Sequence, residues 1–302
     1  MTNDELKQHI AAFARDYSIE ITPHDAGKLD AIRAELAPGT AVYVAHPPGV
    51  PIDDIVTLAG QVQKLGLKAT PHIIARKLES KDQLERALAR CQELGIHNAL
   101  CVAGDITADK PAFDSSLEVL QTGLFAKYSF REVGVAGHPE GSKAIGEERV
   151  EQALRGKAAF AANAGFNMYF ATQFGFDPQP FIDWEAATTA KGINLPIHVG
   201  MPGPAKLTQL AKFAMLCGVG ASMRMLTTRT SAMASLLSAQ APDDMVTALA
   251  KYRGSNPQSR FQKMHFFAFG GVVKTARWAN AVGLGRFVLN SQATGFKVED
   301  VN

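Results

Sequence analysis

Glu20 stands in the short run Tyr17-Ser-Ile-Glu-Ile-Thr-Pro23, whose alternating apolar residues predict a β-strand. A carboxyl group in a strand that is covered on both faces either points to an open end of the fold or is buried at a cost in free energy. Partial burial would raise its pKa toward neutrality, which suits a general acid. The alternative interpretation is a solvated carboxylate on an outward face. We favour the catalytic interpretation.

Other polar side chains also follow predicted strands. Five of the eight histidines fall at or just after such strand ends: His24, His46, His72, His138 and His198. Asp105 follows Gly104, and either approaches a ligand there or caps the next helix. Gln173 either satisfies buried backbone groups or reads the edge of a heterocycle with its donor and acceptor. This clustering predicts a concave polar site at one end of a barrel.

The sequence lacks the residues that several other chemistries require. The sequence has no His-Glu-x-x-His, no His-x-His on the first strand and no Gly-x-Ser-x-Gly, so we expect no metal and no nucleophilic serine. Three cysteines without a C-x-x-C pair exclude a disulfide framework, and Cys101 is expected to be an inert buried thiol. Lys68 and Lys263, the candidates for a Schiff base, fall near the amino-terminal ends of predicted strands, at the wrong end of a barrel.

The elements that must position these residues alternate along the chain. Strands are predicted near 16–22, 40–45, 67–72, 97–103, 130–137, 166–171, 194–200 and 263–269. Amphipathic helical patterns separate them, for example at 82–94 before Gly95. Eight such units favour a (β/α)8 TIM barrel, with extra helices inserted at 221–254 before the last strand. We expect residues 1–302 to form a single catalytic barrel domain. A doubly wound open sheet is the alternative, weakened because no G-x-G-x-x-G or P-loop motif is present.

Composition limits the class of partner. The 302 residues carry 31 basic and 29 acidic side chains, a net charge of +2, which gives no reason to expect binding to nucleic acid or to an anionic membrane surface. No run of about eighteen apolar residues predicts a membrane span, and the polar N-terminus is unlike a signal peptide. We expect a cytoplasmic protein. The sequence does not fix the oligomeric state; a homo-oligomer is the expectation.

Taken in order, several motifs resemble the methylenetetrahydrofolate reductase family. They are Ser-Ile-Glu-Ile-Thr-Pro (18–23), Ala-Thr-Pro-His (69–72), Ala-Gly-Asp (103–105), Val-Ala-Gly-His-Pro-Glu (135–140), Ala-Thr-Gln-Phe-Gly-Phe-Asp (171–177), the stretch beginning His198-Val-Gly-Met-Pro and the stretch 206–219. The resemblance covers nearly the whole chain. It implies a barrel that carries FAD and reduces 5,10-methylenetetrahydrofolate to 5-methyltetrahydrofolate with NADH or NADPH, or runs the reverse reaction.

The resemblance also assigns roles. Glu20 matches the general acid that protonates N10 of the substrate, Asp105 matches a residue that contacts the pterin and adds negative charge near the flavin, and Gln173 matches a pterin ligand. Cofactor contacts are implied at His46, His72, Ala103, Gly104, Asp105 and His138.

The chain departs from the family pattern at cofactor and folate contacts. Ala103 replaces an arginine before Gly-Asp, and His138 replaces a tyrosine before Pro-Glu. A lysine expected before the sixth strand is missing, and Lys157 or Arg155 is its candidate substitute; Lys274 or Arg277 would replace an arginine after the last strand. A flavin-free relative, a barrel lyase or aldolase, and a folate- or flavin-binding protein without turnover therefore stay open as alternatives.

Overall fold

The computed structural model describes residues 1–106, 110–142, 145–216 and 239–299. Its barrel strands are β1 (Ser18–Ile21), β2 (Ala41–Val44), β3 (Lys68–Ile74), β4 (Asn98–Val102), β5 (Glu132–Gly137), β6 (Asn167–Phe174), β7 (Ile197–Pro202) and β10 (Phe261–Phe267). They are hydrogen-bonded in the closed order β1-β10-β7-β6-β5-β4-β3-β2, and the registers are parallel, as for Ala41 with Lys68 and Asn98 with Glu132. The predicted (β/α)8 TIM barrel is therefore confirmed.

Helices alternate with these strands. They are α1 (Asn3–Arg15), α2 (Leu29–Glu35), α3 (Ile52–Lys64), α4 (Lys81–Glu93), α5 (Ser116–Gln121), α6 (Leu124–Lys127), α7 (Glu147–Ala161), α8 (Gln179–Ala190), α9 (Leu207–Leu216), α12 (Asp243–Ser255) and α13 (Val272–Gly283), with 3-10 helices η1 (Pro23–Lys28) and η2 (Ala75–Lys77). In α4 the predicted pattern is confirmed: the Ser80 hydroxyl accepts from the Gln83 N–H at 3.1 Å, and Gly95, at φ +72°, follows the last turn.

The strand predictions agree with the structure to within two residues at each end, except that β6 ends three residues later and β7 begins three residues later than predicted. Two short antiparallel ribbons were not predicted: β8 (Ala205–Lys206) with β9 (Ala239–Gln240), and β11 (Phe287–Leu289) with β12 (Phe296–Val298). Of the predicted insertion at 221–254, the structure shows α12, and residues 221–238 lie outside the described residues.

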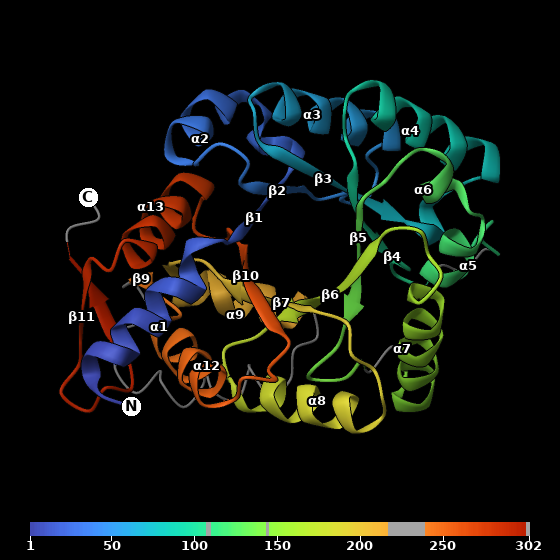
Figure 1. Cartoon of the computed structure of the whole chain (residues 1–302). Helices are drawn as coiled ribbons and strands as arrows, with labels where there is room; N and C mark the ends of the chain where they lie inside the picture. The colour runs from blue at the N-terminus through green and yellow to red at the C-terminus, as the bar shows by residue number, and fades with distance from the viewer. Residues whose placement is uncertain (107–109, 143–144, 217–238, 300–302) are drawn as a thin grey trace. The chain divides into compact units, whose positions relative to one another are not determined.

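The chain divides into two compact units, whose boundaries fall within β1, at the β5 end and within β6. The first unit comprises Met1–Ile19, His138–Gly141 and Thr172–Asn302; the second comprises Glu20–Gly137 and Ser142–Ala171. In the second unit α3 packs on β3 and against α4 (Figure 1). The single-domain organisation stays a prediction.

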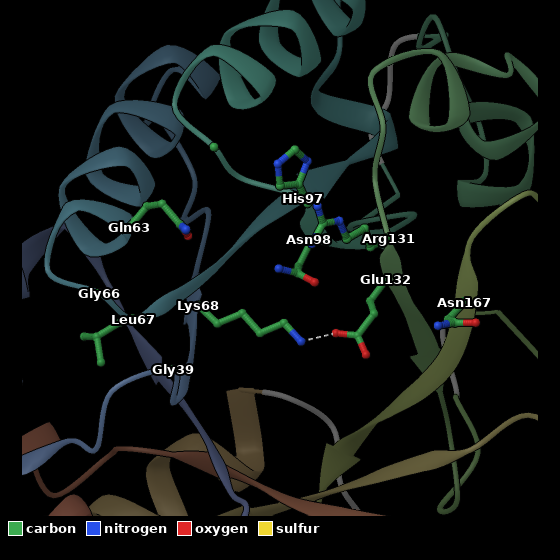
Figure 2. A pocket seen from close by; sticks show the side chains of 11 residues that line it. Gly39, Gln63, Gly66, Leu67, Lys68, His97, Asn98, Arg131, Glu132 and Asn167 are labelled. Atoms are coloured by element: carbon green, nitrogen blue, oxygen red, sulfur yellow. Dashed lines mark hydrogen bonds and ion pairs between the residues drawn. The ribbon is translucent and has the colours of Figure 1, made fainter.

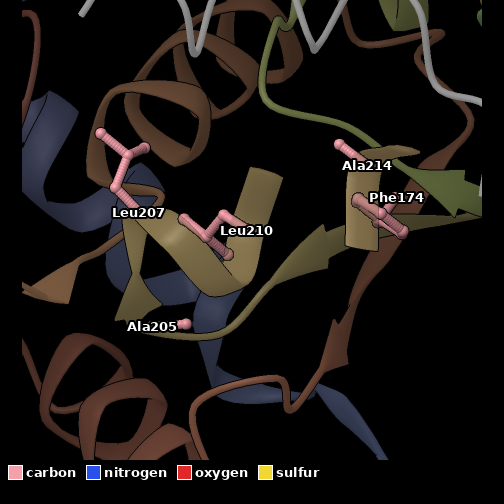
Figure 3. Close-up of a cluster of buried hydrophobic side chains, with 5 residues drawn as sticks. All are labelled: Phe174, Ala205, Leu207, Leu210 and Ala214. Carbon is pink, nitrogen blue, oxygen red and sulfur yellow. The ribbon is translucent and has the colours of Figure 1, made fainter. Parts of the chain in front are cut away.

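Each unit has its own apolar core. In the first unit Phe174 of β6 packs with side chains of the β8–α9 segment (Figure 3): Ala205, Leu207, Leu210 and Ala214. In the second unit, residues of β2, β4 and β6 meet: Ala41, Tyr43, Leu100, Tyr169 and Ala171. Because these three strands are not neighbours in the sheet, their side chains meet only on its inner face.

Among the described residues, no helix combines the length and the apolar composition needed to cross a lipid bilayer.

Candidate functional site

Polar side chains gather where β1, β2, β3 and β4 of the second unit end. Because these strands are parallel, their carboxyl ends lie at one edge of the sheet. The side chains concerned, called here the strand-end cluster, are Glu20, His46, His72, Lys77 and Asp105. Four of them were predicted from the sequence, whereas Lys77 was not.

Glu20 and His72 form the closest pair of ionisable side chains in the cluster. Glu20 Oε2 lies 3.4 Å from His72 Nε2, and the two side chains are 17% and 13% exposed. Since β1 and β3 are separated by β2, a direct contact between their side chains is made across β2, on the inner face of the sheet. The Glu20 carboxyl therefore points inward and not into the helical layer, as a catalytic role requires.

Tyr43 packs against His72 of this pair. Its ring meets the His72 ring edge-on, with 6.2 Å between centroids, and its hydroxyl shares a 2.5 Å hydrogen bond with the hydroxyl of Tyr169. Burial raises the pKa of Tyr43 well above its ordinary value, and the nearby Tyr169 adds to the shift. Both hydroxyls are thus neutral at physiological pH.

His46 and Lys77 are held together after β2 and β3. His46 Nε2 shares a 2.7 Å hydrogen bond with the Val50 carbonyl, and Lys77 Nζ donates to the carbonyls of His46 and Pro47 at 2.6 and 2.7 Å. Burial lowers the pKa of His46, and the charge of Lys77 lowers it further. His46 is therefore neutral at physiological pH, with Nδ1 buried and without a hydrogen-bond partner among the described residues.

The turn at residues 103–105 leaves β4 at its carboxyl end. Gly104 has φ +83°, and a Cβ there would lie 2.3 Å from Ile74 Cγ2, so both backbone conformation and space require glycine. Arg76 Nη1 donates to the Gly104 carbonyl at 2.7 Å, and its Nε donates to Asp114 at 3.0 Å. Asp105 is exposed.

Arg76 and Lys77 were not identified from the sequence. The prediction ended the third strand at His72, whereas β3 continues to Ile74 and is followed by η2, which carries both cations. Burial lowers the pKa of Lys77, and the charge of Asp105 opposes this shift. Ala103 lacks the positive charge of an arginine. Arg76, which follows β3, places a positive charge next to the same turn.

Lys157 and Arg155, the candidate substitutes for a missing lysine, have different surroundings on α7. Arg155 forms an exposed ion pair with Glu151 at 2.9 Å. Lys157 is buried, its Nζ lies 3.3 Å from the Ala136 carbonyl, and burial lowers its pKa to about 8. Cys101 is buried as expected, which raises the pKa of its thiol to about 12.

Gln173 and His138 belong to the first unit. Gln173 Oε1 is buried without a hydrogen-bond partner among the described residues, and the neighbouring β7 approaches closely, since a Cβ at Gly200 would lie 2.6 Å from the Gln173 carbonyl oxygen. The His138 carbonyl accepts from the Gly141 N–H in a turn at 3.0 Å. The roles of these two residues stay predictions.

The placement of His198 differs from the sequence prediction, whereas His24 follows β1 as predicted. His198 is the second residue of β7, at its amino-terminal end, and its Nε2 pairs with Gln262 at 3.2 Å. The shift arises because Pro196 has no N–H, so the ladder begins at Ile197 and not at 194. His24 is exposed on η1.

The two lysines considered for a Schiff base are both paired with carboxylates. Lys68 opens β3 and pairs with Glu132, and Lys263 lies near the start of β10 with its Nζ 3.0 Å from Asp16. Within the described ranges no three His, Cys, Asp or Glu side chains are arranged to hold a metal ion.

Comparisons with known proteins give relatives of this chain. A family model described as methylenetetrahydrofolate reductase matches residues 53–251. The chain is 27% identical over 128 residues to methylenetetrahydrofolate reductase 1 of Schizosaccharomyces pombe; the match covers 40% of this chain and 21% of that protein. The chain thus spans about a fifth of the length of this relative.

A solved structure shares the fold. It is an uncharacterized protein from Clostridium thermocellum that binds two copies of 5-methyl-5,6,7,8-tetrahydrofolic acid, with a TM-score of 0.51 and 12% identity over 92% of this chain and 97% of that one.

Proposed function

The chain belongs to the methylenetetrahydrofolate reductase family, and from that premise we propose that it interconverts 5,10-methylenetetrahydrofolate and 5-methyltetrahydrofolate, with Glu20 as general acid. The reducing equivalents would come from NADH or NADPH through FAD. The fold neighbour from Clostridium thermocellum, which binds 5-methyltetrahydrofolic acid, supports a folate ligand.

The observation that carries the proposal is the inward Glu20 carboxyl beside His72. A general acid must be held within reach of its substrate and must be partly withdrawn from water. The inward direction of Glu20 and its 17% exposure support this role. A solvated surface carboxylate would meet neither.

Glu20 would hold the proton that goes to N10 of the folate, so that the five-membered ring opens to a 5-iminium ion. His72 would keep the carboxyl in place and return a proton to it between turnovers, since its Nε2 lies 3.4 Å from Glu20 Oε2. Asp105, with its carboxylate close to the turn after β4, would stabilise the positive charge of the iminium ion. Gln173 is proposed as a further pterin contact.

The residues of the strand-end cluster fit a flavin. Buried His46 Nδ1 lacks a partner among the described residues, and the missing side chain at Gly104 allows the main chain to approach a planar ring. Lys77 uses two of its three N–H groups on carbonyls, which leaves one for a phosphate. His72 and Ala103 complete the proposed contacts in this unit, and a contact at His138 rests on the family resemblance alone. When bound, the flavin would pass hydride from the nicotinamide to the folate carbon.

The visible spectrum of the purified protein tests this proposal. We expect flavin absorption bands that bleach with NADH or NADPH under anaerobic conditions and return when methylenetetrahydrofolate is added, with methyltetrahydrofolate as product. A flavin that bleaches but is not reoxidised by the folate would contradict the reaction. A colourless protein that forms methyltetrahydrofolate from NADH or NADPH would contradict the proposal that the protein binds a flavin. It would remain consistent with Glu20 as general acid.

A further inference from the structure

A second polar pocket lies at the opposite ends of the strands, entirely within the second unit (Figure 2). Its volume is about 560 Å³, within the usual range for small-molecule sites. It is lined where β2 to β6 begin, by Gly39, Gln63, Gly66, Leu67, Lys68, Gly95, His97, Asn98, Arg131, Glu132 and Asn167. We call it the amino-end pocket. No residue of the strand-end cluster lines the amino-end pocket.

The amide of Asn98 is the most informative group in the amino-end pocket. Asn98 is only 8% exposed, and the accessible part of it lies at the amino-end pocket. Figure 2 shows its amide directed toward the space between Lys68 and Glu132. An amide offers both a donor and an acceptor to a polar ligand. This side chain could therefore hydrogen-bond an occupant of the pocket.

The charges of the pocket indicate the sign of that occupant. Lys68 and Glu132 form an ion pair, with each side chain 39% exposed, and so cancel each other. Arg131 is exposed at the rim, and its guanidinium has no partner among the described residues. The remaining charge is one positive charge, which a single carboxylate would balance. A guanidinium binds a carboxylate through two parallel hydrogen bonds.

The rest of the lining indicates the body of the ligand. Apart from Leu67, the lining side chains are amides, charged groups and an imidazole, so their carbon stems supply the apolar surface of the pocket and their ends supply hydrogen-bonding groups. Amides both donate and accept, as hydroxyl groups do. Asn98, Asn167 and Gln63 are spread around the pocket, with Gln63 Oε1 accepting from the Ala69 N–H at 3.2 Å, and a chain of hydroxyls would match the remaining amide groups.

We propose that the amino-end pocket binds a small polyhydroxylated monocarboxylate, of the sugar-acid class, with its carboxylate on Arg131 and its hydroxyls on Asn98 and the neighbouring amides. The site is separate from the strand-end cluster, because the buried Tyr43–Tyr169 pair fills the inner face of the sheet between them. The proposal is independent of the reaction proposed above.

Titration calorimetry of the whole protein with gluconate, at millimolar concentrations, tests the proposal. Sorbitol, which has the hydroxyls without the carboxylate, and acetate, which has the carboxylate alone, serve as ligand controls. We expect gluconate to bind and both controls to bind at least about tenfold more weakly. Absence of gluconate binding, or equal binding of sorbitol, would overturn the proposal.

Variants locate the binding. Arg131→Gln should raise the gluconate Kd at least about tenfold, and Asn98→Ala should raise it severalfold, because each removes a direct hydrogen bond. Arg86→Gln on α4 is the matched control, an exposed arginine outside the pocket, and should leave the Kd unchanged. Since Arg131 is exposed, its variant is expected to fold. Unchanged binding in Arg131→Gln, or equal weakening in Arg86→Gln, would contradict the assignment of the site.

Discussion

The carboxyl group of Glu20 meets the imidazole of His72 across β2, with 3.4 Å between Oε2 and Nε2. The two residues are far apart in sequence, and neither strand neighbours the other in the sheet. Their contact fixes the direction of the Glu20 side chain, which is what the general-acid hypothesis needed. The contact also links β1 to β3 near their carboxyl ends.

Replacement of Glu20 by glutamine should lower methylenetetrahydrofolate turnover by at least about 10²-fold, the usual contribution of a general acid. The amide keeps the size of the side chain and loses the transferable proton. Oxidation of NADH or NADPH with an artificial electron acceptor, followed by stopped-flow absorbance, should change much less, because that half-reaction needs no proton from Glu20.

The matched control for this variant is Glu79→Gln, which removes an exposed carboxylate after β3 and should leave both half-reactions unchanged. Equal losses in the two half-reactions of Glu20→Gln would mean that Glu20 serves the fold or the cofactor and not proton transfer.

Gly104→Ala should destabilise the protein by several kcal/mol. At φ +83° a side chain adds about 1–2 kcal/mol of backbone strain, and the new Cβ would meet Ile74 Cγ2, for which overpacking costs about 1–3 kcal/mol more. Urea unfolding monitored by circular dichroism measures the change. Because Arg76 holds the same turn, the substitution should also weaken folate turnover.

Two variants separate strain from the steric clash at Gly104. Gly123→Ala has a similar φ of +74° with nothing within 4 Å of the new Cβ, so it should show only the strain. Ile74→Ala combined with Gly104→Ala should recover the clash contribution. If Gly104→Ala were no more costly than Gly123→Ala, the predicted close approach of Ile74 would be wrong.

Much of the fold could be predicted because strand and helix patterns are local. The run Ala41-Val-Tyr-Val44 reads as a strand from its own residues, and eight such runs separated by helices leave few architectures. The strand-end positions of Glu20, His46 and Asp105 follow from the same pattern. The end of β3 was placed two residues early, and that small error concealed Lys77 of the strand-end cluster and the neighbouring Arg76.

Contacts between non-adjacent strands could not be predicted in this way. Tyr43 and Tyr169 both look like apolar strand residues in the sequence, and only the closed sheet brings their hydroxyls to 2.5 Å. The small residue Gly134 gives the Tyr169 ring its space, since a Cβ there would lie 2.7 Å from the ring. Side-chain pairing of this kind depends on register and curvature, which the residue pattern does not encode locally.

Tyr43→Phe should cost about 1–3 kcal/mol of unfolding free energy, because it removes the hydrogen bond between the two buried hydroxyls. Tyr169→Phe should cost a similar amount. The double variant removes both polar groups, so its loss should be smaller than the sum of the two single losses. Chemical denaturation of all four proteins gives this double-mutant cycle. Strict additivity would show that the two hydroxyls do not interact. Tyr128→Phe, which breaks a hydrogen bond to Glu85 at the surface, should cost less than either.

Lys157→Met should stabilise the protein at pH 7 and remove a pH dependence. Burial lowers the pKa of Lys157 from 10.5 to about 8, which corresponds to about 3 kcal/mol against the charged folded form, reduced in the variant by the lost contact with the Ala136 carbonyl. Between pH 8 and 10.5 the unfolded chain binds this proton more tightly than the folded one, so wild-type stability gains from Lys157 as pH rises. Urea unfolding at pH 7 and pH 10 should therefore show the stability advantage of Lys157→Met over wild type shrinking at the higher pH.

Lys64→Met, at an exposed lysine of α3, should show no such pH-dependent difference from wild type. A constant difference between Lys157→Met and wild type at both pH values would mean that Lys157 is charged at no cost in the folded protein.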